Sequence, residues 1–281
     1  MPTASGALEA EFAKAAACID AIGTADPRAE RMVVAGHGYG SHGGDNEGLY
    51  PPLLAALGEL AATSQVVGLT GDISRSGSLD SFTRIDNELS GWPTVLAAPG
   101  NHDVGSPESR AAFESVFGQP FGSRVLGDSL VLWIDTDVDD WRISGEQLQW
   151  MRQALSSNDA KAASSVVVLT HHLIWSRGDR SDFPVNGGPR DRSAARDPDQ
   201  LQQLLEPLGK PVLVISGDVG AFPEQVSIAC DIRGPVSYVA SGVGGGLQDT
   251  VLVVALSPTP TVHVCRVGGD GVDEQCLAAA N

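Results

Sequence analysis

The chain has 281 residues, a formal net charge of -17 at pH 7 and a sequence pI near 4.5. Because this length suffices for one large α/β layer structure with a full core, we expect a single domain over residues 1–281. The strong negative charge disfavours a nucleic-acid backbone or an anionic membrane surface as the main partner. An anionic substrate would then need a local cation, which a bound metal ion can supply.

The sequence contains no apolar run of the roughly 20 residues that a membrane-spanning helix requires. Residues 1–6 also lack the basic region and apolar core of a signal peptide. We therefore expect a cytoplasmic protein, unless a leader has been removed. The cysteines, which are Cys18, Cys230, Cys265 and Cys276, show no metal-binding spacing. Cys265 and Cys276 flank a glycine-rich turn signal, so they either form a disulfide across a hairpin or remain free buried thiols.

Hydrophobic periodicity and turn signals divide the chain into alternating helices and strands. In chain order we expect helix 7–22, strand 32–35, helix 51–62, strand 66–70, helix 79–89, strand 94–98, helix 108–117, strands 123–126 and 130–134, a helix starting at 144–146, strand 165–170, a helix near 198–207, and strands 211–216, 235–240, 250–256 and 261–267. The alternation predicts βαβ units with parallel strands, followed by an antiparallel end. Residues 1–30 form an N-terminal helical extension and residues 257–281 a C-terminal β-hairpin and tail in this scheme.

Side chains that handle metals or protons follow the expected strands. Strand 66–70 runs into Asp72, strand 94–98 runs into the segment 100–103, and strand 165–170 runs into His171 and His172. In an open α/β sheet ligands gather outside the carboxyl ends of the strands, so these residues are expected to converge although they lie far apart in the sequence. Five of the six histidines lie just past an expected strand, which supports this interpretation.

These motifs resemble those of the calcineurin-like metallophosphoesterases. The resemblance spans roughly residues 31–256 and rests on Gly71-Asp72, Gly100-Asn101-His102-Asp103, Gln147-Leu148-Gln149-Trp150-Met151 and His171-His172. It implies a mixed α/β fold, a four-layer sandwich of two mixed sheets with flanking helices. It also implies two metal ions, commonly Fe, Mn, Zn or Co, that activate a water molecule to attack phosphorus.

The resemblance assigns roles to individual residues. One metal would be held by Asp72, which bridges both metals, together with Asn101, His171 and the residue at position 218. The other would use Asp72 and positions 37, 39 and 220. His102 would stabilise the charge that develops on the phosphate and protonate the leaving oxygen, and Asp103 would orient His102.

The first and last motifs depart from the family pattern. His37 stands in place of an aspartate, Tyr39 and Asp218 each stand in place of a histidine, and Gly220 stands in place of another. We therefore expect one firm metal at Asp72, Asn101, His171 and Asp218, and a second, weaker metal near His37 and Asp72. His42 or Asp45, in the same glycine-rich loop, is an alternative donor for the weaker site.

Candidate substrate-binding residues surround this centre. Arg75 is expected to contact phosphate, and His42 and His172 are further candidates. We expect His172 to support the site or to pack beside it rather than to bind a metal. Tyr39 is either a hydrogen-bond donor to phosphate or a lid on its loop. The arginine-rich segment 174–196 is either a lid that selects substrate or a solvated, salt-bridged loop. Residues 242–246 are expected to form a tight loop near the site, since no helix follows them as in a phosphate cradle.

The sequence thus predicts a metal-dependent phosphoesterase that hydrolyses a phosphate mono- or diester of a small molecule with the help of Mn, Fe or Zn. Two alternatives remain. The chain could be a catalytically silent relative that serves as a binding or regulatory protein, as the altered motifs suggest. It could also perform metal-dependent chemistry at a non-phosphate centre on the same scaffold. The oligomeric state is left open.

Overall fold

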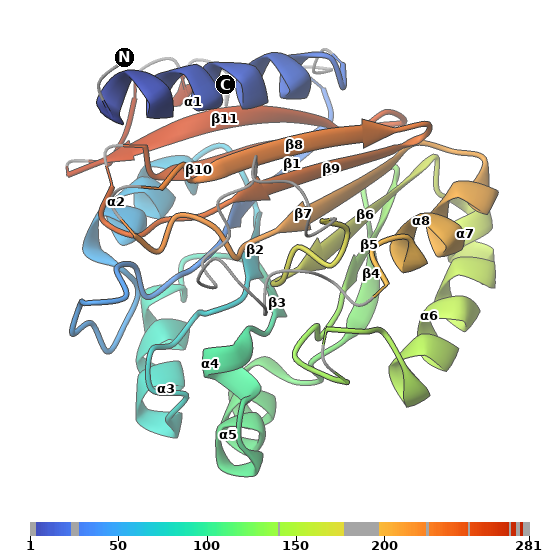
Figure 1. Cartoon of the computed structure of the whole chain (residues 1–281). Coiled ribbons are helices and arrows are strands. Elements are labelled where there is room, and N and C mark those ends of the chain that lie inside the picture. Colours follow the sequence, from blue (N-terminus) through green and yellow to red (C-terminus); the bar gives the residue numbers. More distant parts are fainter. Residues whose placement is uncertain are drawn as a thin grey trace.

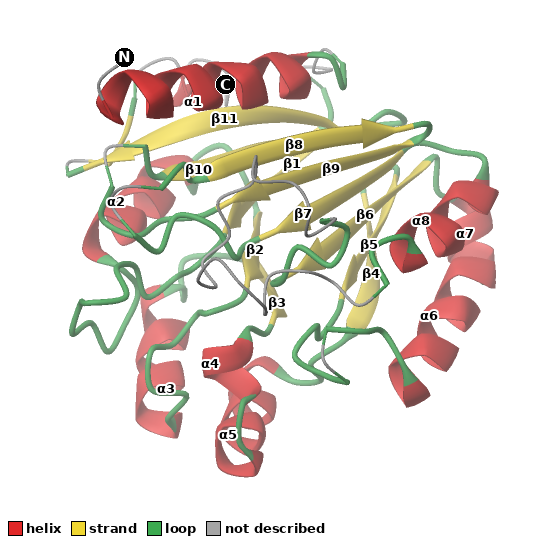
Figure 2. Cartoon of the chain, in the orientation of Figure 1, coloured by secondary structure: helices red, strands yellow, loops and turns green. Residues whose placement is uncertain are grey.

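Two six-stranded sheets face each other in the computed structural model, with helices on their outer faces (Figures 1 and 2). The structure describes residues 4–23, 28–139, 141–176, 197–222, 225–246, 248–269, 271–273 and 276–277. Each sheet contains both parallel and antiparallel pairs. The predicted mixed α/β architecture is therefore confirmed.

The first sheet has the strand order β12-β11-β10-β1-β2-β3. Its parallel part pairs β1 with β2 and β2 with β3, and β10 joins the other edge of β1 in the antiparallel sense. The strands are β1 (Glu30–Ala35), β2 (Val66–Thr70), β3 (Thr94–Ala98), β10 (Thr250–Leu256), β11 (Thr261–Gly268) and β12 (Gly271–Val272).

The second sheet has the order β4-β5-β6-β7-β9-β8. Its four central strands run parallel, and the two edge strands are antiparallel to their neighbours. The strands are β4 (Gly122–Leu126), β5 (Ser129–Trp133), β6 (Ser165–Thr170), β7 (Val212–Ser216), β8 (Ile228–Arg233) and β9 (Val236–Ser241).

Apolar side chains form a core between the sheets and one on each outer face. Val34, Leu169 and Val239 belong to the central core, which both sheets share. The outer face of the first sheet packs against α2 (Pro51–Leu60), α3 (Leu79–Glu88) and α5 (Pro107–Phe117). The outer face of the second sheet packs against α6 (Gly145–Ser156), α7 (Asn158–Ala162) and α8 (Gln200–Leu205), with a 3-10 turn at Glu206–Leu208. The central strands, such as β2, β6 and β7, are buried on both faces and are therefore continuous apolar runs.

The N-terminal helix α1 (Ala4–Asp20) lies over β8 and β11, where it covers the end of the central core (Figure 1). Ala15 and Ile19 contribute to that core, and Cys18 forms a disulfide with Cys230 in β8. A second disulfide joins Cys265 to Cys276 beside the β11-β12 hairpin. The sequence left the second pairing open and did not identify the first. No helix in the described ranges is long and apolar enough to span a bilayer.

Two expectations about the chain's end need correction. The strand expected at 235–240 corresponds to β9, which pairs parallel with β7 and antiparallel only with β8. The sequence did not reveal β8, because Asp231 and Arg233 interrupt its apolar pattern at the sheet edge. The short helices α4 (Asn101–Val104) and α7 were also not predicted. The remaining described elements agree with the expected ones to within a few residues.

Candidate metal centre

The carboxyl ends of the parallel strands from both sheets bring the ligand-type residues together. His37 follows β1, Asp72 follows β2, His171 and His172 follow β6, and Asp218 follows β7. Within each sheet the neighbouring strand ends are hydrogen-bonded: the backbone N–H of His37 donates to the Gly71 carbonyl, and those of Gly217 and Asp218 donate to the His171 carbonyl. The two sheets approach closely at this edge, where Nδ1 of His171 lies 3.1 Å from the Thr70 carbonyl oxygen.

Two glycines permit this close approach. Gly71 has φ +80°, and a Cβ there would overlap the ring of His171. A Cβ at Gly217 would overlap the carbonyl group of Thr70. Any larger residue would separate the strand ends and disperse the side chains gathered here.

Asp72 lies between two imidazoles, each facing a different carboxylate oxygen. Its Oδ2 is 3.4 Å from Nε2 of His37, and its Oδ1 is 3.3 Å from Nε2 of His171. Nε2 of His171 is also 3.9 Å from Oδ1 of Asp218. These side chains are almost completely buried, with relative exposures of 3% for Asp72, 2% for His37, 0% for His171 and 7% for Asp218. Asp72 therefore has the placement that a bridging carboxylate requires, with a potential metal position on each side.

The orientation of His171 suits a metal ligand. Its Nδ1 lies 3.1 Å from the Thr70 carbonyl oxygen, which accepts a hydrogen bond from Nδ1–H. The lone pair of Nε2 then points into the cluster, where Nε2 is buried and has no hydrogen-bond partner among the described residues. A buried polar atom without a partner is costly unless a ligand satisfies it. In many metal sites one ring nitrogen of a histidine donates to a backbone carbonyl, and the other ring nitrogen binds the metal.

The electrostatics of the cluster favour a cation. Burial lowers the pKa of His37 to about 4 against the opposing effect of Asp72, so its imidazole is neutral at pH 7 and able to coordinate. Burial opposes ionisation of Asp72, but His171 and His37 outweigh it and lower the pKa of that carboxyl group. Burial likewise disfavours charge on His171, while Asp72 and Asp218 raise the pKa of its ring. Imidazole and carboxylate donors together fit Mn, Fe or Zn better than Ca.

The predicted ligands are not equally close to the cluster. One ligand atom each from His171, His172 and Asp218 lie within 4.8 Å of one another, and all three residues are buried. Asn101 is the first residue of α4; it is exposed and makes no side-chain hydrogen bond within the described part of the chain. The backbone N–H of the next residue, His102, donates to Oδ1 of Asp72 at 3.2 Å.

The side of Asp72 that faces His37 is poorer in donors. Tyr39 is buried, and its ring centroid lies 4.4 Å from that of His37 and 5.0 Å from that of His102. Burial raises the pKa of Tyr39, so its phenol stays protonated. Gly220 has φ +81° and offers no side chain. His42 and Asp45 are exposed, and the ring of His42 packs 5.4 Å from that of Phe222.

His102 is held by partners that the sequence did not predict. Its Nδ1 lies 3.0 Å from the Arg75 carbonyl oxygen, and its Nε2 lies 3.4 Å from the Tyr39 hydroxyl. Asp103, which is expected to orient this ring, has its described hydrogen bonds elsewhere. Asp103 is fully buried and accepts backbone N–H groups from Ile73, Ser74 and Gly100 at 3.1, 2.9 and 2.8 Å, so it fixes two strand-end loops instead.

The segment after β5 also reaches the cluster, although sequence reasoning passed over it. The Thr136 hydroxyl lies 2.9 Å from Nδ1 of His172, and Asp135 pairs with Arg110 at 2.7 Å. Burial and the charge of Asp135 raise the pKa of Asp137 to about 6. Gln147 clamps the segment through both the N–H and the carbonyl of Asp135. The signal was present, since these acids also stand directly after an apolar strand.

The glycine-rich loop 242–246 is not a phosphate cradle. The Asp249 carboxylate accepts the N–H groups of Gly244, Gly245 and Gly246 at 3.1, 2.9 and 3.0 Å. The Asp249 carboxylate therefore already occupies the N–H groups of this loop, in agreement with the expected tight loop. Of the arginine-rich segment 174–196, residues 177–196 lie outside the described residues.

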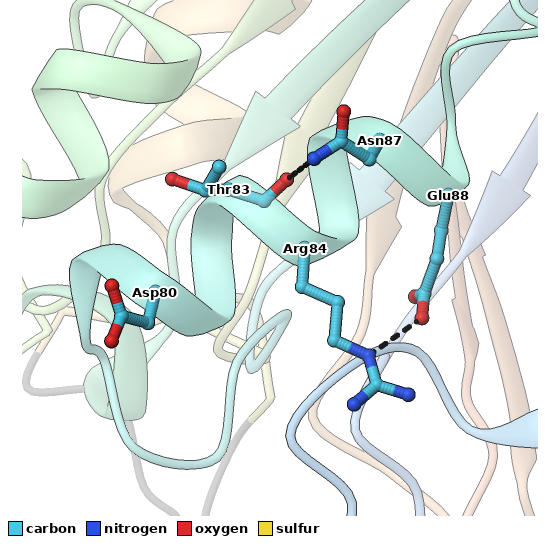
Figure 3. A pocket seen from close by; sticks show the side chains of 5 residues that line it. All are labelled: Asp80, Thr83, Arg84, Asn87 and Glu88. Atoms are coloured by element: carbon cyan, nitrogen blue, oxygen red, sulfur yellow. Dashed lines mark hydrogen bonds and ion pairs between the residues drawn. The ribbon is translucent and has the colours of Figure 1, made fainter.

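A depression over α3 is lined by Asp80, Thr83, Arg84, Asn87 and Glu88 (Figure 3). Its polar groups serve the helix itself: Arg84 pairs with Glu88 at 3.0 Å, and Asn87 donates to the Thr83 carbonyl at 2.8 Å. None of these residues belongs to the cluster around Asp72. We therefore assign the chemistry to the buried cluster rather than to this surface feature.

Comparison with known proteins gives a partial match to a curated protein. No family model matches the chain. It is 29% identical over 181 residues to the 3',5'-cyclic adenosine monophosphate phosphodiesterase CpdA of Pseudomonas aeruginosa, an alignment that covers 61% of this chain and 58% of the relative. The chain thus spans less than two thirds of that protein.

Solved structures share the fold at low sequence identity. Purple acid phosphatase PPD1 from yellow lupin matches with a TM-score of 0.63 at 14% identity, over 90% of this chain and 55% of that one. A dimetal phosphatase from Danio rerio matches with 0.59 at 14% identity, over 88% and 98% of the two chains. GAP50, the anchor in the inner membrane complex of Plasmodium, matches with 0.52 at 13% identity, over 90% and 95%.

The chain therefore shares the mixed α/β fold of these solved phosphatases, with a cluster of ligand-type residues at its strand ends.

Proposed function

We propose that this protein is a metal-dependent phosphoesterase that hydrolyses a phosphate mono- or diester of a small molecule. The observation that carries the proposal is the buried Asp72 carboxylate, whose two oxygens face His37 and His171 at 3.4 and 3.3 Å. The partial match to a cyclic-nucleotide phosphodiesterase and the fold shared with a dimetal phosphatase support this reaction class, and with it a place in the calcineurin-like metallophosphoesterase superfamily.

The residues that would hold the firm metal are Asp72, His171 and Asp218, with Asn101 as the further ligand implied by the family. A second, weaker metal is assigned to His37 and Asp72. Mn, Fe or Zn bound there would neutralise phosphate charge and supply an activated water as nucleophile. The buried, unpartnered Nε2 of His171 supports this assignment.

His102 is assigned as the catalytic acid. Because the Arg75 carbonyl accepts from Nδ1, the second proton of the imidazolium is carried on Nε2, beside Tyr39. That proton is available to a leaving oxygen. Arg75 is half-buried and its Nη1 has no hydrogen-bond partner among the described residues, which suits a contact to phosphate. Tyr39 and His42 remain candidates for substrate contact.

Hydrolysis assays test the proposal directly. Chelated protein is resupplied with Mn, Fe, Zn or Co and assayed with a nitrophenyl phosphate monoester and diester, beside His102→Ala and His171→Ala. We expect activity that requires metal and falls at least 100-fold in His102→Ala, which should retain its metal. His263→Ala, in β11, is the matched control and should behave as wild type. Metal-loaded protein that cleaves neither ester contradicts the proposal.

A catalytically silent binding protein is the second candidate. It is favoured by Tyr39 and Gly220, which provide no histidine on the His37 side of Asp72, and by the shared fold of GAP50, an anchor protein. The intact His102 argues against it, because this residue is not needed to bind metal. Inactivity toward both esters, with metal bound, would favour this candidate.

The two disulfides bear on the cellular compartment in which the protein resides. Cys18–Cys230 and Cys265–Cys276 account for every cysteine of the sequence. Structural disulfides persist in oxidising compartments and are rare in the cytosol. We therefore propose an oxidising compartment in place of the expected cytoplasm, testable by counting free thiols in protein isolated from its source under denaturing, alkylating conditions.

A further inference from the structure

His172 is buried beside the candidate metal ligands, although the sequence predicts only a substrate-binding or supporting role for it. It follows His171 at the end of β6, has a relative exposure of 1%, and offers a ring nitrogen within 4.8 Å of ligand atoms of both His171 and Asp218. The fourth ligand implied by the family, Asn101, is instead exposed. The buried donors thus suggest a different composition for the firm site.

The ring of His172 is fixed by two neighbours. The Thr136 hydroxyl accepts the backbone N–H of His172 at 3.0 Å and lies 2.9 Å from its Nδ1. The indole of Trp141 stacks on the ring with a centroid distance of 4.3 Å and an interplanar angle of 22°. When Nδ1–H donates to Thr136, the lone pair of Nε2 is left for a metal, as in many histidine ligands oriented by a second hydrogen bond.

We propose that His172 is a direct metal ligand of the firm site, which it completes together with Asp72, His171 and Asp218. Thr136 and Trp141 are positioning residues that hold its ring. This inference rests on the proposed function, since it concerns the same metal centre.

The donor set has a definite chemistry. Two imidazoles and two carboxylates give four donors and two negative charges, which balance a divalent cation. Imidazole suits Zn, Fe and Co, and carboxylate suits Mn, so the site is expected to take a borderline transition metal rather than Mg or Ca. With four protein donors the amide of Asn101 is not needed to complete the coordination of the firm metal.

The test counts histidine ligands spectroscopically. The full-length protein is stripped with chelator and loaded with one equivalent of Co²⁺, and proton NMR records the solvent-exchangeable, hyperfine-shifted imidazole N–H signals. Each histidine bound through Nε2 contributes one such signal from Nδ1–H. Spectra recorded in a His37→Ala background remove the nitrogen on the other side of Asp72 from the count.

In that background we expect two signals, one of which disappears in His172→Ala. Cobalt affinity should fall roughly 100-fold or more, beyond the 10–100-fold typical of an outer residue. Thr136→Val should keep both signals and lose affinity within that outer range, and His263→Ala should change neither.

Two signals that persist in His172→Ala, or a single signal from the start, would overturn the ligand assignment while leaving metal-dependent hydrolysis intact. A two-signal spectrum from protein without phosphoesterase activity would support the ligand and count against the enzyme. Wild-type protein that binds no cobalt overturns both.

Discussion

Replacing Asp103 tests whether this residue serves the His102 ring or the loops. Asp103 accepts three backbone N–H groups, from Ile73, Ser74 and Gly100, and is fully buried. An unsatisfied buried donor costs about 1–3 kcal/mol, so Asp103→Ala should lower the free energy of unfolding by roughly 3–5 kcal/mol after relaxation. Asp103→Asn keeps one acceptor oxygen and should lower the free energy of unfolding by roughly 1–3 kcal/mol.

The pH dependence supplies an independent signature. Burial, assisted by the charge of Asp72, raises the pKa of Asp103 to about 7 from an ordinary value of 3.8. The folded apoprotein therefore holds this proton more tightly than the unfolded chain does. The stability that comes from this tighter binding of the Asp103 proton is fully present below pH 3.8 and is lost as the pH rises to about 7. Asp103→Asn does not titrate and should lack this slope, which amounts to a few kcal/mol in the wild type.

Urea denaturation of chelated protein between pH 4 and 8 measures both effects. Asp86→Ala, an exposed aspartate on α3, is the matched control and should stay within about 0.5 kcal/mol of wild type. If Asp103→Ala unfolds at the same urea concentration as the wild type, Asp103 does not stabilise the two loops. The raised pKa of Asp103 is contradicted if Asp103→Asn retains the wild-type pH slope. A selective loss of kcat with unchanged stability would restore the orienting role implied by the family.

Further outcomes follow from the same contacts. Arg75→Ala should raise KM for a phosphoester several-fold while metal content, measured by elemental analysis, stays unchanged; an unaltered KM would exclude the phosphate contact. Cys18→Ser with Cys230→Ser opens a loop of 212 residues and should cost about 2–5 kcal/mol in urea denaturation, as large native loops do. Metal at 100 times its dissociation constant should stabilise the protein by about 2.7 kcal/mol, so chelation should lower Tm. Asp218→Asn should weaken the tighter step of a calorimetric metal titration more than the weaker step, and equal loss at both would contradict two unlike sites.

Much of the fold could be predicted from local sequence pattern. Strands β2, β3 and β6 have the expected bounds because short apolar runs that are mostly buried stand out from their surroundings. The edge strand β8 was missed because its polar residues break the apolar run. The Cys18–Cys230 pairing, across 212 residues, depends on how α1 docks and leaves no local signal.

The convergence of ligand-type side chains at the strand ends could also be predicted from local pattern. A polar residue directly after a buried strand is a local signal, and it identified Asp72, His171 and Asp218. Contacts made by backbone carbonyls carry no residue-specific signal, so the Arg75 carbonyl beside His102 was unpredictable. The true partners of Asp103 are likewise backbone N–H groups. In both cases the family resemblance suggested a side-chain contact where the structure has a main-chain one.

The exchanged first and last motifs redistribute charge across Asp72 rather than remove it. His37 replaces an aspartate of the family pattern, so the His37 side of Asp72 has one carboxylate fewer. Asp218 replaces a histidine, so the His171 side has one carboxylate more, and Oδ1 of Asp218 lies 3.9 Å from Nε2 of His171. The phenol of Tyr39 adds no charge on the depleted side, since burial raises its pKa. One charge at about 4 Å is worth about 4 kcal/mol at an effective dielectric constant near 20. A difference of that order is enough for a cation to occupy the His171 side while the His37 side fills only at much higher metal concentration, which is why we expect two unlike sites around one shared carboxylate.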